Sequence, residues 1–353
     1  VARVAAEDLS EEAFRASFDG CRPVLLTGAG GPCGTVAGPF LQALVRTIGE
    51  RELAFEVQGC SHDSARPVSM QRKKFKEFLA DLDGASPGAA LWLFCEDALA
   101  SPALAEMLQA PPMHCAGASG LLALLPAAFR PRSKHALWLA SHGARGVWRR
   151  DPGGLCTWLL AVLGRASYRL RPPERPPPGA VRGDRGAGVA PLGFAAVEPS
   201  QRGPWEWEVV QEPGEVLVIP AGWWYAPLCE EKLLAVQSEY LSAALVPRVL
   251  REQLSPFGVD LALEGLTPQA LAMRVAEELK KSGHPLDPPR RCSGLFPVGE
   301  TTLIEEGVMG STPADDLLGL MWHLSRRYPQ FVMAGTELPV DAEQWSASDL
   351  ELF

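Results

Sequence analysis

Histidine and cysteine, the side chains best suited to metal binding and nucleophilic chemistry, are scattered along the chain. The six histidines are His62, His114, His135, His142, His284 and His323. The eight cysteines are Cys21, Cys33, Cys60, Cys95, Cys115, Cys156, Cys229 and Cys292. No C-x-x-C, H-x-H, H-x-D or H-E-x-x-H spacing occurs among them. The sequence therefore lacks the usual ligand patterns of zinc knuckles, thioredoxin-type redox pairs and His-based metal sites.

Two further catalytic patterns are missing. The G-x-S-x-G elbow of the hydrolases does not occur, so no nucleophilic serine is indicated. The glycines between Gly28 and Gly31 follow a β-like run, but they carry neither a Walker lysine nor the Rossmann spacing. We interpret this segment as a turn and not as a phosphate-binding loop.

Two segments carry a more specific pattern. Residues 146–173 read GVWRRDPGGLCTWLLAVLGRASYRLRPP, and residues 213–242 read PGEVLVIPAGWWYAPLCEEKLLAVQSEYLS. The first combines Asp-Pro-Gly with a strand that ends in Pro-Pro, and the second combines Pro-Gly-Glu with an apolar strand and Pro-x-Gly-Trp-Trp. Together they resemble the two halves of a Jumonji C (JmjC) domain of the cupin superfamily, close to its protein-hydroxylase and arginine-demethylase-like branch. The resemblance covers residues 8–245.

This resemblance implies a double-stranded β-helix that holds Fe(II) and uses 2-oxoglutarate and O₂ as co-substrates. The family's metal ligands are a His-x-Asp pair on one strand and a distant histidine, a set that leaves coordination positions open. In this sequence Arg149 stands at the first histidine position, Asp151 at the aspartate position and Tyr225 at the distal histidine position. A guanidinium stays protonated and has no lone pair for a metal, so we expect no resident iron.

Arg149 and Asp151 are two residues apart, which on a β-strand places their side chains on one face. We hypothesise that an Arg149–Asp151 ion pair takes the place of the metal. One alternative is that both residues lie at a solvated pocket mouth and have no role. Another is that Asp151, Tyr225 and a displaced His142 rebuild an unusual metal site.

The family's co-substrate positions have also lost their polar groups. The lysine that would pair with the 2-oxoglutarate carboxylate is replaced by Ala166, and a strand asparagine is replaced by Leu159. Trp92 stands where a tyrosine is common, and Glu239 stands at the asparagine position of the last strand. The expected pocket is too apolar for a dicarboxylate, which Glu239 would also repel. We therefore expect no cofactor.

The elements that must position these residues are mostly short strands. Apolar runs at 91–95, 135–140, 158–163, 168–170, 205–210, 215–220 and 233–240 are separated by glycine and proline, a pattern typical of β-sandwiches and barrels. Helices are predicted near the N-terminus and at residues 70–82. Residues 171–193 are rich in proline and predict a polyproline-like surface insertion. Fold class is thus mainly β with flanking helices: a JmjC-like cupin domain over residues 1–245, then a C-terminal helical region over 246–353.

Composition and charge limit the classes of partner. The chain has 353 residues, is 47% hydrophobic and carries a net charge of −9, values typical of a globular protein. No apolar run approaches the roughly 20 residues of a membrane helix, and the first residues do not resemble a secretory signal. We expect an intracellular protein of the cytoplasm or nucleus with no membrane association, and the net negative charge argues against nucleic-acid binding.

Three functions are compatible with this reading. We expect a pseudoenzyme that has lost Fe(II)/2-oxoglutarate dioxygenase activity and binds a protein partner. The first alternative is an active, divergent protein hydroxylase or demethylase that uses Fe(II) and 2-oxoglutarate. The second is a small-molecule-binding cupin. An apolar helix expected at residues 312–328 makes a homodimer through C-terminal helices a further hypothesis.

Overall fold

The structure is a computed structural model, and it describes residues 1–29, 33–59, 69–84, 89–96, 135–182, 187–190 and 206–241, with isolated positions at 98, 99, 101, 104, 107, 245 and 249. Contacts divide the chain into two units. The first unit, Val1–Gly117 with Pro131–Tyr240, contains every helix and strand named below. The C-terminal helix expected at 312–328 lies outside the described residues, so the predicted domain boundary and the predicted dimer remain predictions.

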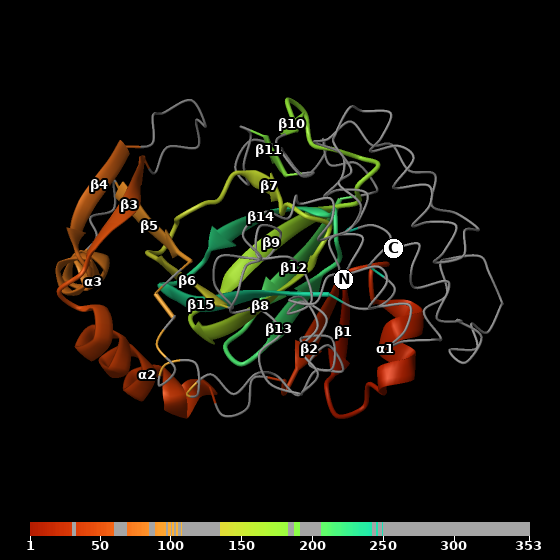
Figure 1. Ribbon diagram of the computed structural model, residues 1–353, viewed down its shortest axis with the longest axis horizontal. Coiled ribbons are helices and arrows are strands. Elements are labelled where there is room, and N and C mark those ends of the chain that lie inside the picture. Colours follow the sequence, from red (N-terminus) through yellow and green to blue (C-terminus); the bar gives the residue numbers. More distant parts are fainter. Residues whose placement is uncertain are drawn as a thin grey trace, which may run out of the picture. The chain divides into compact units, whose positions relative to one another are not determined.

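The described part of the chain is mainly β, as its punctuated apolar runs predict, and its strands form two sheets (Figure 1). The first sheet has the order β1-β2-β13-β8-β15-β6-β5-β3-β4. Its strands are β1 (Ala2–Ala5), β2 (Val24–Thr27), β3 (Glu52–Gly59), β4 (Ser69–Lys74), β5 (Ala89–Cys95), β6 (His135–Ala140), β8 (Cys156–Leu163), β13 (Val216–Ile219) and β15 (Leu233–Tyr240).

The second sheet has the order β10-β11-β7-β14-β9-β12. Its strands are β7 (Trp148–Arg150), β9 (Ala166–Arg171), β10 (Val181–Arg182), β11 (Gly188–Ala190), β12 (Trp207–Gln211) and β14 (Trp224–Cys229). From β6 onward the chain passes back and forth between the sheets, because β6, β8, β13 and β15 belong to the first and β7, β9, β12 and β14 to the second. Strands distant in the sequence, such as β7 and β14, thereby become neighbours.

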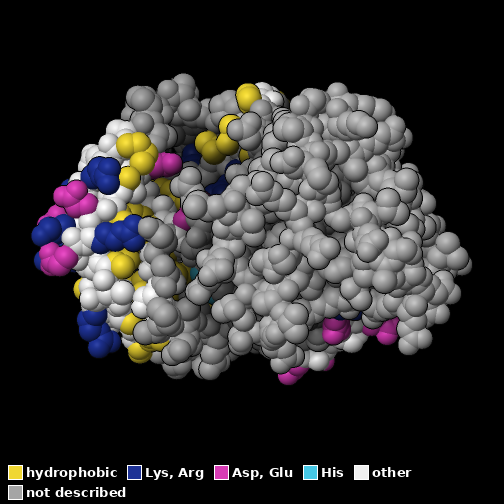
Figure 2. Space-filling model, in the orientation of Figure 1, with side chains coloured by type: hydrophobic (Ala, Val, Ile, Leu, Met, Phe, Trp, Pro, Cys, Tyr) yellow, Lys and Arg dark blue, Asp and Glu magenta, His cyan; other side chains and the backbone are white. Residues whose placement is uncertain are grey.

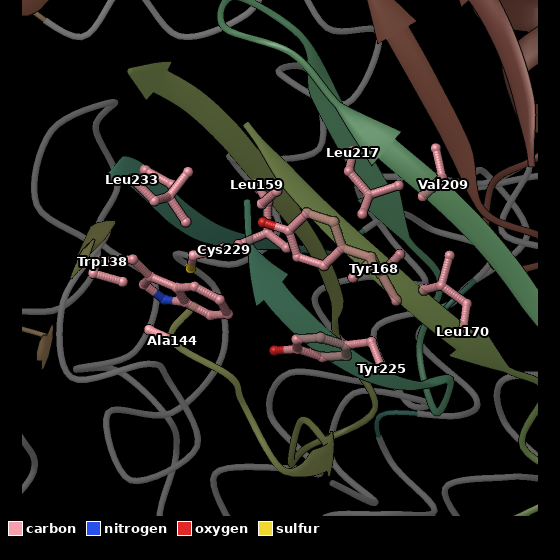
Figure 3. Packing of buried hydrophobic residues seen from close by; sticks show 14 of the residues in the cluster. Trp138, Ala144, Leu159, Tyr168, Leu170, Val209, Leu217, Tyr225, Cys229 and Leu233 are labelled. Atoms are coloured by element: carbon pink, nitrogen blue, oxygen red, sulfur yellow. The ribbon is translucent and has the colours of Figure 1, made fainter. Parts of the chain in front are cut away.

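The core lies between the two sheets. One continuous cluster of buried side chains combines Trp138, Leu159 and Leu217 of the first sheet with Tyr168 and Tyr225 of the second (Figure 3). These residues recur at every second position of their strands, since successive side chains of a strand point to opposite faces. The inward faces of β7, β8, β14 and β15 therefore meet inside the sandwich, where the candidate site lies.

In the part of the chain that the structure describes, three helices flank the sheets: α1 (Glu11–Ser17), α2 (Cys33–Ile48) and α3 (Phe75–Asp83). The prediction of one helix over residues 70–82 is wrong in its first half. Residues 69–74 form strand β4, which pairs with β3 from Val57↔Ser69 to Glu52↔Lys74, and the helix begins only at Phe75. Long-range backbone pairing with β3 thus prevails over the local helical pattern, a common outcome when the two compete.

The basic run at the end of β4 is part of a mixed surface. Lys74 and Lys76 both pair with Glu50, and Lys73 pairs with Asp81. Figure 2 shows basic and acidic side chains close together on this side of the molecule. Such exposed pairs contribute little to stability, and they leave no large patch of one sign.

The proline-rich segment is not a plain surface insertion. Within residues 171–193, β10 and β11 form an antiparallel hairpin that pairs with β7 through β11. Ala190 of β11 is buried in a small cluster with Trp148 and Trp224, so part of this segment packs against the sandwich. The sequence does not reveal this hairpin because its strands have only two and three residues, too few to show the alternating pattern of a strand. Among the described residues, no helix has the length and apolar character needed to cross a membrane.

Candidate functional site

The candidate site lies where β7 and β14 run side by side. Arg149 of β7 and Tyr225 of β14 are direct antiparallel partners in the register. Asp151 follows the last residue of β7, and Thr157 is the second residue of β8 in the other sheet. Strands β7, β8 and β14, with the residue that follows β7, therefore bring four polar side chains together beside an otherwise apolar core.

The Asp151 carboxylate accepts hydrogen bonds from three side chains. Arg149 donates from Nη2 to Oδ1 at 3.0 Å, which is the ion pair that the residue spacing predicts. The Tyr225 hydroxyl lies 3.0 Å from Oδ1 and 2.9 Å from Oδ2, and the Thr157 hydroxyl donates to Oδ2 at 2.6 Å. Because the Asp151 side chain is only 8% exposed, these donors replace the water that would otherwise solvate its charge.

The Arg149 guanidinium is surrounded by aromatic rings. Its Cζ atom lies 5.2 Å from the ring centre of Phe94, 5.6 Å from that of Trp138 and 5.4 Å from that of Tyr225. All three distances fall within the range of cation–π attraction. The side chain retains 28% exposure, so the guanidinium is held at the border between the core and solvent.

The ionisation of the two cross-strand partners follows from these surroundings. Burial by itself would lower the pKa of Arg149, but its interactions with Tyr225, Asp151 and Glu239 outweigh that effect and raise the pKa above its ordinary value. Burial raises the pKa of Tyr225 well above 10.0, and Asp151 adds to the rise while Arg149 opposes it. Arg149 is therefore a permanent cation, and Tyr225 remains a neutral hydrogen-bond donor at physiological pH.

The positions predicted to line a co-substrate pocket fall into two groups. Trp92, Leu159 and Ala166 are buried and belong to the core cluster between the sheets. Glu239 lies on β15 as the register partner of Thr157, and its charge acts on both Arg149 and Tyr225. The predicted pocket positions thus comprise three buried apolar side chains and one acidic side chain.

His142, the histidine considered as a substitute ligand, lies elsewhere. Its ring is exposed, and Nδ1 is 2.6 Å from the backbone oxygen of Glu230. Within the ranges that the structure describes, no three His, Cys, Asp or Glu side chains are grouped as metal ligands would be.

The sequence pattern did not reveal Thr157, Phe94 or Trp138 as members of this site. Phe94 lies two residues after Trp92 on β5, and Trp138 lies two residues before Ala140 on β6, so both point to the same inward face as these core residues. That alternation was visible in the sequence, yet it cannot show which inward residue lies beside Arg149. Strand register decides this, and register depends on pairings between distant segments.

Comparison with known proteins gives a distant relationship. No family model matches the chain. The chain is similar to the arginine-specific demethylase JMJ22 of Arabidopsis thaliana, with 26% identity over 127 residues, which cover 34% of this chain and 25% of that protein. This likeness and the β-rich fold support a JmjC- or cupin-like relationship. The match spans about a quarter of the relative's length.

Proposed function

We propose that the chain is a JmjC-like protein built on a double-stranded β-helix. Eight of the ten strands from β6 onward form two antiparallel layers of four, in the order β13-β8-β15-β6 in the first sheet and β7-β14-β9-β12 in the second. An eight-stranded double-sheet arrangement is the architecture of jelly rolls and cupins. The likeness to a JmjC demethylase supports the same assignment.

We further propose that this protein has lost Fe(II)/2-oxoglutarate dioxygenase activity. The observation that carries this proposal is the state of Asp151, whose two oxygens are both engaged by Arg149, Tyr225 and Thr157. The donor set does not fit iron, because a guanidinium offers no lone pair and the Tyr225 hydroxyl is held in its neutral form. Ala166 and Leu159 likewise supply no charge for 2-oxoglutarate.

Metal content and turnover test the loss of activity. We expect purified protein to contain no stoichiometric transition metal by mass spectrometry and to keep its melting temperature when a chelator is added, since nothing then dissociates from the native state. We also expect no succinate above a boiled control when Fe(II) and 2-oxoglutarate are supplied. Stoichiometric iron or succinate production above that control would establish the divergent hydroxylase or demethylase instead.

We propose binding of a protein partner as the remaining function. Val181 and Val189 are register partners on β10 and β11, with exposures of 63% and 56%, and β10 is the edge strand of the sheet that contains Arg149. Exposed apolar side chains beside an open strand edge suit an extended peptide that adds to the sheet. A photo-crosslinking residue at Val189 should therefore capture a defined partner in cells, whereas the same probe at Met70 on β4, 62% exposed, should not.

One observation favours a small-molecule-binding cupin as a second candidate. Within the described interior, Trp138 Nε1, Tyr168 Oη and Gln237 Oε1 are buried and have no hydrogen-bond partner. Unpaired polar atoms are unfavourable in a core, and a bound molecule with complementary groups would satisfy them. Native mass spectrometry tests this candidate, because a retained ligand adds a defined mass that denaturation removes.

A further inference from the structure

The surroundings of Arg149 have the composition of a binding site for a planar cation. Three aromatic ring centres lie within 5.2–5.6 Å of its Cζ atom, and the Asp151 carboxylate accepts one of its hydrogen bonds at 3.0 Å. Aromatic faces and a carboxylate together recognise alkylated or planar cations in proteins. Here the cation belongs to the chain itself.

The walls of this site are held in place without Arg149. Thr157 and Tyr225 each hydrogen-bond to Asp151 independently of the guanidinium. The ring of Trp138 packs edge-on against Phe94, with ring centres 6.1 Å apart, and at a tilt against Trp92, with ring centres 5.1 Å apart. The carboxylate and the aromatic walls are thus fixed by their own contacts, so the site does not need Arg149 to keep its form.

We propose that Asp151 and the rings of Phe94, Trp138 and Tyr225 form a guanidinium-binding cage, and that Arg149 is an internal ligand that closes this cage against external guanidinium compounds. Arg149 enters from the β7 backbone, and its remaining exposure of 28% shows that the cage borders solvent. We expect an external ligand of the same chemistry to reach the cage from solvent once Arg149 is removed. The inference rests on these contacts and does not depend on the protein partner proposed above.

The geometry defines the probe. Arg149→Ala removes the atoms beyond Cβ, which are those of an ethylguanidinium cation. We expect the Arg149→Ala variant to bind ethylguanidinium in the millimolar range, far below the concentrations at which guanidinium salts denature proteins. Bound ligand should raise the melting temperature of the variant by about 2–4 °C, whereas the wild-type protein should show no such rise.

Two control variants separate cage binding from general effects. Arg150→Ala removes the same side chain from the next position of β7, which points to the opposite face of the sheet, and we expect no binding of ethylguanidinium. Arg149→Ala combined with Asp151→Asn keeps the aromatic walls but loses the carboxylate, and we expect binding at least about tenfold weaker than in Arg149→Ala alone. Ethylammonium serves as the ligand control, since it carries a positive charge without the planar fork.

Calorimetric titration gives the affinities, and circular dichroism shows whether each variant is folded. Should Arg149→Ala not fold by itself, ethylguanidinium in the refolding buffer should restore its native spectrum while ethylammonium should not. The inference is overturned if folded Arg149→Ala does not bind ethylguanidinium, if the wild-type protein binds it equally well, or if refolding shows no preference for it. None of these results depends on metal content or turnover, so the proposed loss of activity is judged separately.

Discussion

Arg149 and Tyr225 face each other across the β7–β14 ladder, and both contact the same aspartate. The guanidinium Cζ lies 5.4 Å from the tyrosine ring centre, and the two side chains donate hydrogen bonds to Asp151. In the JmjC resemblance these are the two histidine positions. We propose that a pair which would jointly bind a metal in that family here binds the Asp151 carboxylate instead.

Loss of the tyrosine hydroxyl should weaken this network. Tyr225→Phe removes a buried donor to the Asp151 carboxylate, and we expect the free energy of unfolding to fall by about 1–3 kcal/mol. Tyr168→Phe is the matched control, because the Tyr168 hydroxyl is buried but has no hydrogen-bond partner among the described residues. That control should leave stability unchanged or slightly raised. Urea unfolding of both variants tests the comparison, and equal losses would show that the bonds to Asp151 contribute nothing specific.

Stability should decrease at alkaline pH. Burial raises the pKa of Tyr225 well above 10.0 and the pKa of the Cys156 thiol from 9.0 to about 12. Above pH 9 the unfolded chain therefore releases protons that the native protein keeps, so the free energy of unfolding falls as pH rises towards 12. Each such group contributes up to about 1.4 kcal/mol per pH unit.

Urea unfolding between neutral pH and the alkaline range measures this decrease. Tyr225→Phe should show a smaller decrease above pH 10 than the wild-type protein, because one of the responsible groups is gone. A stability that stays constant through this range, or rises, would contradict the burial of these phenol and thiol groups.

Two substitutions should create a metal site. Antiparallel register partners have their Cβ atoms about 5 Å apart, so Arg149→His together with Tyr225→His places two imidazoles next to Asp151. We expect this double variant to bind Co(II) and to gain about 2–3 kcal/mol of stability when Co(II) exceeds its Kd a hundredfold. Addition of Asp151→Asn should weaken the binding. A folded double variant that does not bind Co(II) would show that positions 149, 151 and 225 are not placed as the ligands of one metal ion.

The turn between β8 and β9 should not accept a side chain. Gly164 has φ +75°, and an added Cβ would lie 1.9 Å from the backbone oxygen of Lys232. Gly143 has a similar φ of +78°, but its Cβ would meet nothing within 4 Å. Gly143→Ala should thus cost about 1 kcal/mol for the backbone conformation alone, and Gly164→Ala clearly more. Thermal unfolding compares the two, and equal effects would contradict the close contact at Lys232.

The sequence by itself determined the mainly β class of the fold and the ion pair at the candidate site. Apolar runs between glycine and proline turns predict strands, and each of the seven predicted ranges overlaps a strand of the structure. The expectation that Arg149 cannot serve as a metal ligand follows from residue type alone, since no fold can give a guanidinium a lone pair. The ion pair with Asp151 follows from their spacing of two residues, which is a local property of the backbone.

Tertiary structure decided what surrounds that ion pair. Thr157 and Tyr225 lie close to Asp151 because β8 and β14 belong to facing sheets, and Phe94 and Trp138 reach Arg149 from two further strands. The strand β4 and the β10–β11 hairpin likewise depend on pairing with distant segments. Register and sheet order arise from such long-range pairing, which local periodicity does not encode. They decide which aromatic rings surround the Arg149–Asp151 ion pair.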